Sequence, residues 1–281
     1  MTSAAHDALP SRSPAAIRAA SSAEGSTSGG WRPLSLVPSK CFVCNDDDAE
    51  PVAVGQDFDC SSSPDSFLAV RCRRCGLVYL NPAPAPGELE ATHLLGRDLG
   101  FEIARLRKRL GNSARVLHVR GIEDLDHPQN AYDAALLTNV VERVDDPLSA
   151  LKAIGQLLQP GGIALIVTPN TEATVCKVFQ GRHWSGYNFP RHRNLFCAHA
   201  LGEAARMAGL EMVSVGTVGA PEAWVESARN TMTDWNLPHW MLAALNRGWG
   251  AALMAAAAIE WWQRVRGKGG LLRATLRRPS E

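Results

Sequence analysis

The chain has 281 residues, of which 46% are hydrophobic and 20% are charged, and its formal net charge is +1. This length suits one ordinary domain with an appendage, or two small domains. Because 29 Lys and Arg nearly cancel 28 Asp and Glu, the chain lacks the positive field of an indiscriminate nucleic-acid binder, and we expect no nucleic-acid partner. Seven cysteines, four of them in two C-x2-C pairs, indicate metal binding in a reducing compartment, so we expect a cytoplasmic protein.

Residues 1–37 are mostly Ala, Ser, Pro, Gly and Thr, a composition that cannot bury enough apolar surface to order itself, so we predict a disordered tail. The tail has no apolar core of a secretory signal, and its acidic residues Asp7 and Glu24 count against a transit peptide. Residues Trp31 to Val37 are the first that we expect to touch the folded body.

Two cysteine pairs follow within residues 38–87, which we interpret as a small zinc-ribbon-like module with a Pro-rich linker. Four thiolates at about 2.3 Å fill a tetrahedral Zn²⁺ shell and leave no open position, so the predicted zinc is structural. Iron is a lesser alternative, because thiolates bind both metals, and Cys60 is an alternative fourth ligand. The predicted metal ligands are Cys41, Cys44, Cys72 and Cys75.

The middle of the chain alternates strands and helices. We predict an amphipathic helix over Ala104 to Leu110, strands at Val116 to Val119 and Ala131 to Leu137, a helix from Pro147 to Leu158, and a strand from Ile163 to Val167. Unbroken apolar strands alternating with helices predict an α/β fold with a parallel sheet covered on both faces. Ligands of such sheets bind beyond the carboxyl ends of the strands.

The run from Tyr132 to Asn170 (YDAALLTNVVERVDDPLSALKAIGQLLQPGGIALIVTPN) resembles the central stretch of the class I S-adenosylmethionine-dependent methyltransferases. The run from Trp184 to Phe196 resembles the W-x-G-x-x-x-P-R-H-x-x-x-F signature of a subgroup that often carries an N-terminal four-cysteine module. The resemblance implies a Rossmann-like, mostly parallel sheet over residues 88–220, S-adenosylmethionine as cofactor, and methyl transfer to a small-molecule or sugar- or lipid-linked acceptor.

Two departures from the family stand out. The glycine-rich G-x-G-x-G turn that follows the family's first strand is not found, and Arg143 stands where the family has His after Glu142. The first strand is then missing. Three explanations of the missing motif remain open: a degenerate relative, a truncated reading of a gene, or a pocket rebuilt from Gly96 to Gly100. The alternative function is a catalytically inactive scaffold that binds a partner.

The resemblance implies a set of cofactor contacts. An acidic side chain at the end of the second strand would bind the ribose, a residue pair would hold the adenine, and a loop residue would pass beneath the sulfonium. For the acids, a role at the positive end of a helix dipole is the alternative. The predicted cofactor-binding residues are Glu102, Ile122, Glu123 and Asn139.

On the acceptor side, His192 matches the signature histidine and is the predicted base, since an ordinary histidine titrates near neutral pH. The alternative is that His192 and Arg191 only fix their loop by hydrogen bonds. Trp184, Tyr187 and Arg191 are the predicted acceptor-binding residues, although packing is the favoured role for Trp184.

Residues 221–268 are rich in tryptophan, and we predict two helices there that form a lid over the acceptor side, followed by a final strand and tail over 269–281. Packing of these tryptophans against the body is the favoured interpretation. The second interpretation is a helix within residues 240–268 that lies in a membrane interface, with Arg264, Arg266 and Lys268 meeting anionic headgroups.

Overall fold

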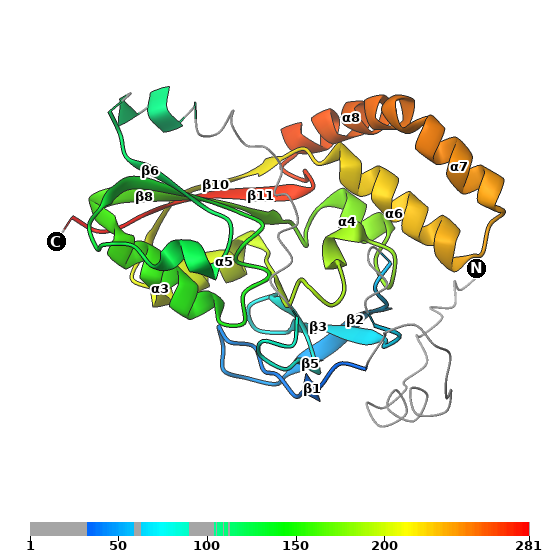
Figure 1. The fold of residues 1–281 in the computed structure, drawn as a ribbon, viewed down its shortest axis with the longest axis horizontal. Coiled ribbons are helices and arrows are strands. Elements are labelled where there is room, and N and C mark those ends of the chain that lie inside the picture. The colour runs from blue at the N-terminus through cyan, green and yellow to red at the C-terminus, as the bar shows by residue number, and fades with distance from the viewer. Residues whose placement is uncertain are drawn as a thin grey trace, which may run out of the picture.

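The computed structural model describes residues 33–58, 63–89, 104, 106–108, 110, 111 and 113–280. Residues 1–32 of the tail predicted over 1–37, Cys60 and Glu102 lie outside the described residues. The tail prediction is wrong at its end, because Leu36 and Val37 form a strand. Three sheets organise the described chain, one of five strands, one of four and one of two (Figure 1).

The five-stranded sheet has the order β10-β11-β8-β7-β6. Strands β6, β7 and β8 are parallel, whereas β11 pairs antiparallel with both β8 and β10. The sheet is therefore mixed, with two parallel and two antiparallel pairings, and not mostly parallel as the resemblance implied. The strands are β6 (Val116–Val119), β7 (Tyr132–Thr138), β8 (Leu158–Pro169), β10 (Glu211–Val218) and β11 (Leu271–Arg277).

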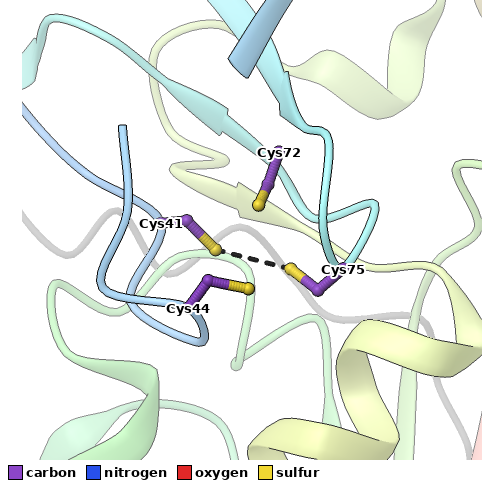
Figure 2. Close-up of side chains that lie close together, drawn as sticks. All are labelled: Cys41, Cys44, Cys72 and Cys75. Atoms are coloured by element: carbon purple, nitrogen blue, oxygen red, sulfur yellow. Dashed lines mark hydrogen bonds between the residues drawn. The ribbon is translucent and has the colours of Figure 1, made fainter. Parts of the chain in front are cut away.

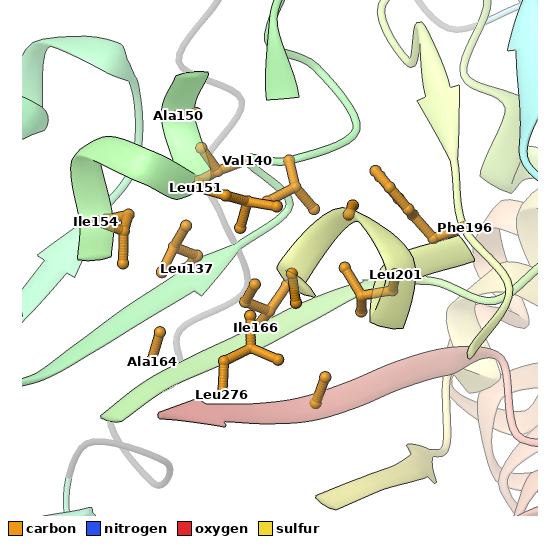
Figure 3. Close-up of a cluster of buried hydrophobic side chains, with 14 of the residues drawn as sticks. Leu137, Val140, Ala150, Leu151, Ile154, Ala164, Ile166, Phe196, Leu201 and Leu276 are labelled. Atoms are coloured by element: carbon orange, nitrogen blue, oxygen red, sulfur yellow. The ribbon is translucent and has the colours of Figure 1, made fainter. Parts of the chain in front are cut away.

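Apolar side chains of β7 alternate between the two faces of this sheet. Ala135 and Leu137 belong to the largest core cluster, beneath helices α3 (Pro147–Leu157) and α5 (Ala198–Met207), as Figure 3 shows. Leu136 points to the opposite face, where it packs with Leu106 and Leu165. Both faces of the parallel strands are thus covered, which is why β7 and β8 have continuous apolar runs.

Helix α3 begins where the sequence supplies a cap and a proline. The Asp146 carboxylate accepts a hydrogen bond from the Ser149 backbone N–H at 3.0 Å, and Pro147 occupies the first turn. The Asp146 side chain is therefore the N-terminal cap of this helix. Leu151 and Ile154, one turn apart, bury this helix against the sheet.

Strand β6 pairs directly with β7, with Val116 opposite Ala134 and Val119 opposite Leu137. Among the described residues no strand lies on its other side, so β6 is the outermost strand of the sheet there. On the side of β7 away from β8, the neighbouring strand is therefore the short segment Val116–Val119. The turn that follows this segment determines which groups the sheet presents to a ligand there.

The N-terminal module is built on the four-stranded antiparallel sheet β2-β3-β4-β9. Its fourth strand, β9 (Asn194–Leu195), lies near the end of the signature run Trp184 to Phe196 and pairs with β4. The two-stranded sheet joins β1 (Leu36–Val37) to β5 (Ala83–Pro84), which brings the start of the described chain onto the Pro-rich linker. The other strands of the module are β2 (Ala49–Gly55), β3 (Phe67–Cys72) and β4 (Val78–Leu80).

Three helices, not the two predicted, lie between β10 and β11: α6 (Pro221–Asp234), α7 (His239–Arg247) and α8 (Trp249–Val265). In Figure 1, α8 runs along the outer side of α6, and α6 lies beside the short helix α4 (Thr174–Val178). No helix among the described residues combines the length and the apolar character that crossing a bilayer requires.

Candidate functional site

The four predicted metal ligands come together. Their sulfur atoms all lie within 4.8 Å of one another, and Figure 2 shows the four side chains directed at a common centre. Cys41, Cys72 and Cys75 are buried and Cys44 is partly buried, and none of them forms a disulfide.

Two tight turns hold the thiols in place. The Asn45 backbone N–H donates to the Cys41 carbonyl at 2.7 Å, and the Gly76 N–H donates to the Cys72 carbonyl at 3.0 Å. Gly76 has φ of 77°, a left-handed conformation that glycine adopts without strain. Each C-x2-C pair therefore sits on one turn of backbone.

The chemistry of this donor set fits a tetrahedral metal ion. Four sulfurs at about 2.3 Å from one ion are roughly 3.8 Å apart, and the sulfurs of Cys41 and Cys75 are 3.4 Å apart. The four-cysteine cluster is thus a possible metal site, as predicted, and a fully thiolate shell leaves no position for a substrate.

A second cluster of polar side chains lies beyond the carboxyl ends of β7 and β8. Glu142 is fully buried, and its Oε2 accepts a hydrogen bond from the Thr168 hydroxyl at 2.9 Å. Its Oε1 has no hydrogen-bond partner and lies 4.0 Å from Nε2 of His192. The strand end of β8 and the signature loop therefore meet at this carboxyl group.

His192 is held in one orientation. Its Nδ1 donates to the Gly186 carbonyl at 2.8 Å, which leaves Nε2 as an acceptor, 3.4 Å from the Asn188 side-chain nitrogen. Burial, helped by Arg143 and Arg191, lowers the pKa of His192 to about 3. The imidazole is therefore neutral at physiological pH, and the expectation that it titrates near neutral pH is wrong.

Glu142 is a residue that our sequence reasoning missed as a site. Burial raises its pKa to about 7, although its own backbone amide, Arg143 and the Thr168 hydroxyl act in the opposite direction. The available signal was a single acid within the apolar run VVERV directly after a buried strand. An acid in that position either faces solvent or is buried with a shifted pKa.

Asn139, the predicted sulfonium-side residue, directly follows β7. Its φ of 52° is left-handed, and its backbone N–H donates to the Val167 carbonyl at 2.9 Å. Its Oδ1 is buried without a hydrogen-bond partner. Asparagine tolerates this backbone conformation better than most residues, so the turn can present this amide at the strand end.

The predicted adenine contacts lie on the neighbouring strand end. Ile122 and Glu123 form the turn η1 (Ile122–Leu125) after β6, and Ile122 is 58% exposed. Carboxyl ends of neighbouring parallel strands meet at one edge of a sheet, which places this turn at the same edge as Asn139. The ribose contact predicted at Glu102 lies outside the described residues.

The turn after β6 contains one glycine, Gly121, with extended backbone. The Glu123 carboxylate folds back over it, and its oxygens lie close to the place that a Cβ of Gly121 would take. The Asp124 carboxylate accepts from the Arg120 N–H at 2.7 Å. This turn is closed by its own side chains.

The residues predicted to bind the acceptor are packed into the body. Trp184 and Tyr187 are buried with ring centroids 5.0 Å apart, and Tyr187 stacks on Phe189. Burial also raises the pKa of the Tyr187 phenol above its ordinary value. Arg191 forms a bidentate ion pair with the buried Asp57 of the module, at 3.1 and 2.9 Å.

Buried polar atoms of proteins normally have partners, so the orphaned oxygens at this edge point to a ligand that brings hydrogen-bond donors. Such a set suits the ammonium group of S-adenosylmethionine, whose N–H groups donate hydrogen bonds, or a donor group of an acceptor. Among the described residues, a cavity of about 300 Å³ lies at the opposite edge of the sheet and is lined by residues that include Asp133 and Gly162. The orphaned oxygens are Thr138 Oγ1, Asn139 Oδ1, Glu142 Oε1 and Asn188 Oδ1.

The sequence was compared with protein families and with known proteins. Residues 83–215 match a family model described as a methyltransferase domain. None of the curated proteins matched the sequence.

Several solved structures match part of this chain at low sequence identity. They include the [4+2]-cyclase SpnF (21% identity, 56% of this chain and 53% of that chain, TM-score 0.33). A putative sarcosine dimethylglycine methyltransferase from Galdieria sulphuraria matches at 12% identity over 55% of this chain and 56% of that one, with a TM-score of 0.31. The Burkholderia thailandensis 1,6-didemethyltoxoflavin-N1-methyltransferase matches at 17% identity, 63% and 56% coverage and a TM-score of 0.31. The chain thus spans little more than half the length of these solved chains.

Proposed function

We propose that this chain, whose residues 83–215 match a methyltransferase domain model, transfers a methyl group from S-adenosylmethionine to a small-molecule acceptor. The observation that carries the proposal is the set of unpartnered acceptor oxygens, including those of Asn139 and Glu142, at the sheet edge where parallel strands bind ligands. S-adenosylmethionine supplies a methyl group on a sulfonium that a nucleophile can displace.

In this proposal Asn139 holds the polar methionine end of the cofactor, and Ile122 and Glu123 flank the adenine. The Asn139 amide oxygen suits an ammonium donor, and the exposed Ile122 side chain suits an aromatic ring. Glu102 remains the proposed ribose contact.

The acceptor would lie near the loop that holds His192. A neutral imidazole with Nδ1 donating to Gly186 presents Nε2 as a hydrogen-bond acceptor, so His192 orients the nucleophile and is a weak base. Trp184, Tyr187 and Arg191 contribute by shaping and anchoring that loop. We further propose that the acceptor is linked to a sugar or a lipid. The proposed location of the protein is the cytoplasm.

The cysteine cluster takes a structural part. We propose that Zn²⁺ bound by the four thiolates holds the module against the methyltransferase segment, since a closed thiolate shell offers no catalytic position.

A catalytically inactive scaffold is the second candidate. It is favoured by the turn after β6, where the single Gly121 is covered by Glu123 and no glycine-rich turn offers its backbone to a cofactor. Loss of such contacts would weaken cofactor binding, and each 1.4 kcal/mol corresponds to about a tenfold change in affinity.

Isothermal titration calorimetry of the full chain with S-adenosylmethionine and S-adenosylhomocysteine separates the two candidates. We expect saturable binding, weakened about tenfold or more in Asn139→Gly, which removes the amide but keeps a residue suited to the left-handed backbone. Asn236→Gly, at another left-handed position in the turn after α6, is the matched control. Absence of any heat with folded protein would favour the scaffold.

A further inference from the structure

Four of the six tryptophans between Pro221 and Val265 are exposed, contrary to the packing that the sequence favoured. Trp235, Trp240 and Trp261 are each 67% exposed. Trp224 is the contrasting case, because its indole N–H donates to Glu260 at 2.7 Å and its ring packs on Phe179. Large apolar side chains gathered on one outer surface mark a contact with a partner or a membrane.

Helix α8 has an inner and an outer face. Ala256 and Glu260, four residues apart, are buried on the inner side, whereas Met254, Trp261 and Val265 are 75%, 67% and 70% exposed. The spacing of seven and four residues places the second set on one face of the helix. This outer stripe is apolar, and Figure 1 shows α7 and α8 forming the outer rim of the molecule.

The charges of this rim have one sign. Between Trp240 and Lys268 the sequence holds a single carboxylate, Glu260. It is buried and accepts hydrogen bonds from the backbone N–H groups of Ala220 and Gly270 and from Trp224. Exposed side chains of α8 therefore contribute no negative charge.

Three exposed cations close the apolar stripe at its carboxyl end, namely Arg264, Arg266 and Lys268. The Arg266 guanidinium lies over the Trp262 ring, 3.5 Å from its centroid. Stacking of this kind places a positive charge beside an indole, at the boundary between apolar and polar surface. Tryptophan beside basic side chains is the composition of segments that lie at a membrane surface.

From this combination we propose that the outer face of α7 and α8 docks on an anionic lipid surface, with the apolar stripe in the interface and the three cations among the headgroups. A second copy of the chain is less suited to this face, since α8 presents no exposed carboxylate that could meet those cations. The docking surface is independent of methyl transfer and holds for an active or an inactive chain.

Sedimentation with vesicles tests this with the full chain. We expect binding to phosphatidylcholine vesicles that contain about one third phosphatidylglycerol, weak binding to pure phosphatidylcholine, and release at high salt. Met254→Asp with Trp261→Asp should reduce binding about tenfold or more. Val213→Asp, at an exposed valine of β10, is the matched control and should bind as the unaltered chain does.

The cations are tested by Arg264→Gln, Arg266→Gln and Lys268→Gln in one chain. Each basic side chain near an anionic surface strengthens binding about fivefold, so the triple change should weaken it about a hundredfold. The proposal is overturned if folded protein ignores anionic vesicles, or if the aspartate variants bind them unchanged. Self-association seen by light scattering, lost in the aspartate variants and without vesicle binding, would assign the face to a second copy instead.

Discussion

Asp57 and Arg191 are joined by two hydrogen bonds of 3.1 and 2.9 Å, although 134 positions separate them in the chain. Asp57 belongs to the cysteine-containing module and Arg191 to the signature loop. The Asp57 side chain is fully buried and that of Arg191 is 10% exposed. A matched pair of this kind makes the position of the loop depend on the module.

Removing one partner of this pair should therefore be costly. We expect Asp57→Ala to lower the free energy of unfolding by about 3 kcal/mol, because the buried guanidinium loses its bidentate bond to the Asp57 carboxylate. Urea denaturation measures this. The exposed pair Glu203 and Arg206, joined at 2.9 Å, is the control, and Glu203→Ala should cost less than about 1 kcal/mol. Equal losses in both variants would show that Asp57 does not anchor the loop.

The cysteine cluster predicts one bound zinc per chain. Elemental analysis of the purified protein should find about one Zn²⁺, lost in Cys72→Ser because a tetrahedral thiolate site loses a ligand. Cys176→Ser, at a buried cysteine outside the cluster, should keep the metal. Iron in place of zinc would identify the other metal, and no metal at all would contradict the site.

Glu142 predicts a pH-dependent contribution to stability. Its pKa is raised from 4.5 in the ordinary carboxyl to about 7 in the folded protein, so the folded state holds the proton more tightly. Its contribution is then fully present below pH 4.5 and is lost as pH rises to about 7, a change of about 3 kcal/mol.

The variant Glu142→Gln removes this titration while keeping the shape of the side chain. We expect the free energy of unfolding of the variant, relative to the unaltered chain, to rise by about 3 kcal/mol between pH 4.5 and pH 7.5. The comparison with the unaltered chain cancels the opposite contribution of His192, whose pKa is lowered. A difference that stays constant with pH would mean that Glu142 titrates normally.

Glu260 predicts how α8 is held to the body. Its carboxylate accepts from the Ala220 N–H at 3.0 Å, the Trp224 indole at 2.7 Å and the Gly270 N–H at 3.1 Å. Glu260→Ala leaves three buried donors without an acceptor and should destabilise the helix packing by about 3 kcal/mol. Hydrogen exchange of the α8 amides should accelerate, while exchange in β7 stays unchanged. Uniform acceleration would show instead that α8 unfolds only with the whole chain.

The local patterns predicted a good part of the fold. The run from Tyr132 to Asn170 indicated β7, α3 and β8 because its apolar spacing changes from strand-like to helical and back. Asp146 before α3 and Pro147 as its first residue marked the start of the helix. The two C-x2-C pairs predicted the cysteine cluster because the ligands within each pair are close in sequence.

Contacts between residues far apart in the sequence could not be predicted from such patterns. The pairing of β6 with β7 and the bond between Asp57 and Arg191 depend on register and packing, which no local pattern encodes. The same reason hid the exposure of Trp235 and Trp261, since composition shows an apolar helix but not which neighbour covers it. His192 illustrates a third case, because its shifted pKa arises from burial and from Arg143 and Arg191 around it.

One apolar cluster contains Cys41, Cys72 and Cys75 of the module together with Phe196 and Leu201. Strand β9, within the signature run, completes the sheet of the module. The cysteine-containing module therefore shares its core and its sheet with the rest of the protein and is not an independent unit. Removal of the metal by a chelator should therefore also disturb the structure at the carboxyl ends of β7 and β8. Metal binding would then determine whether the loop that holds His192 is folded.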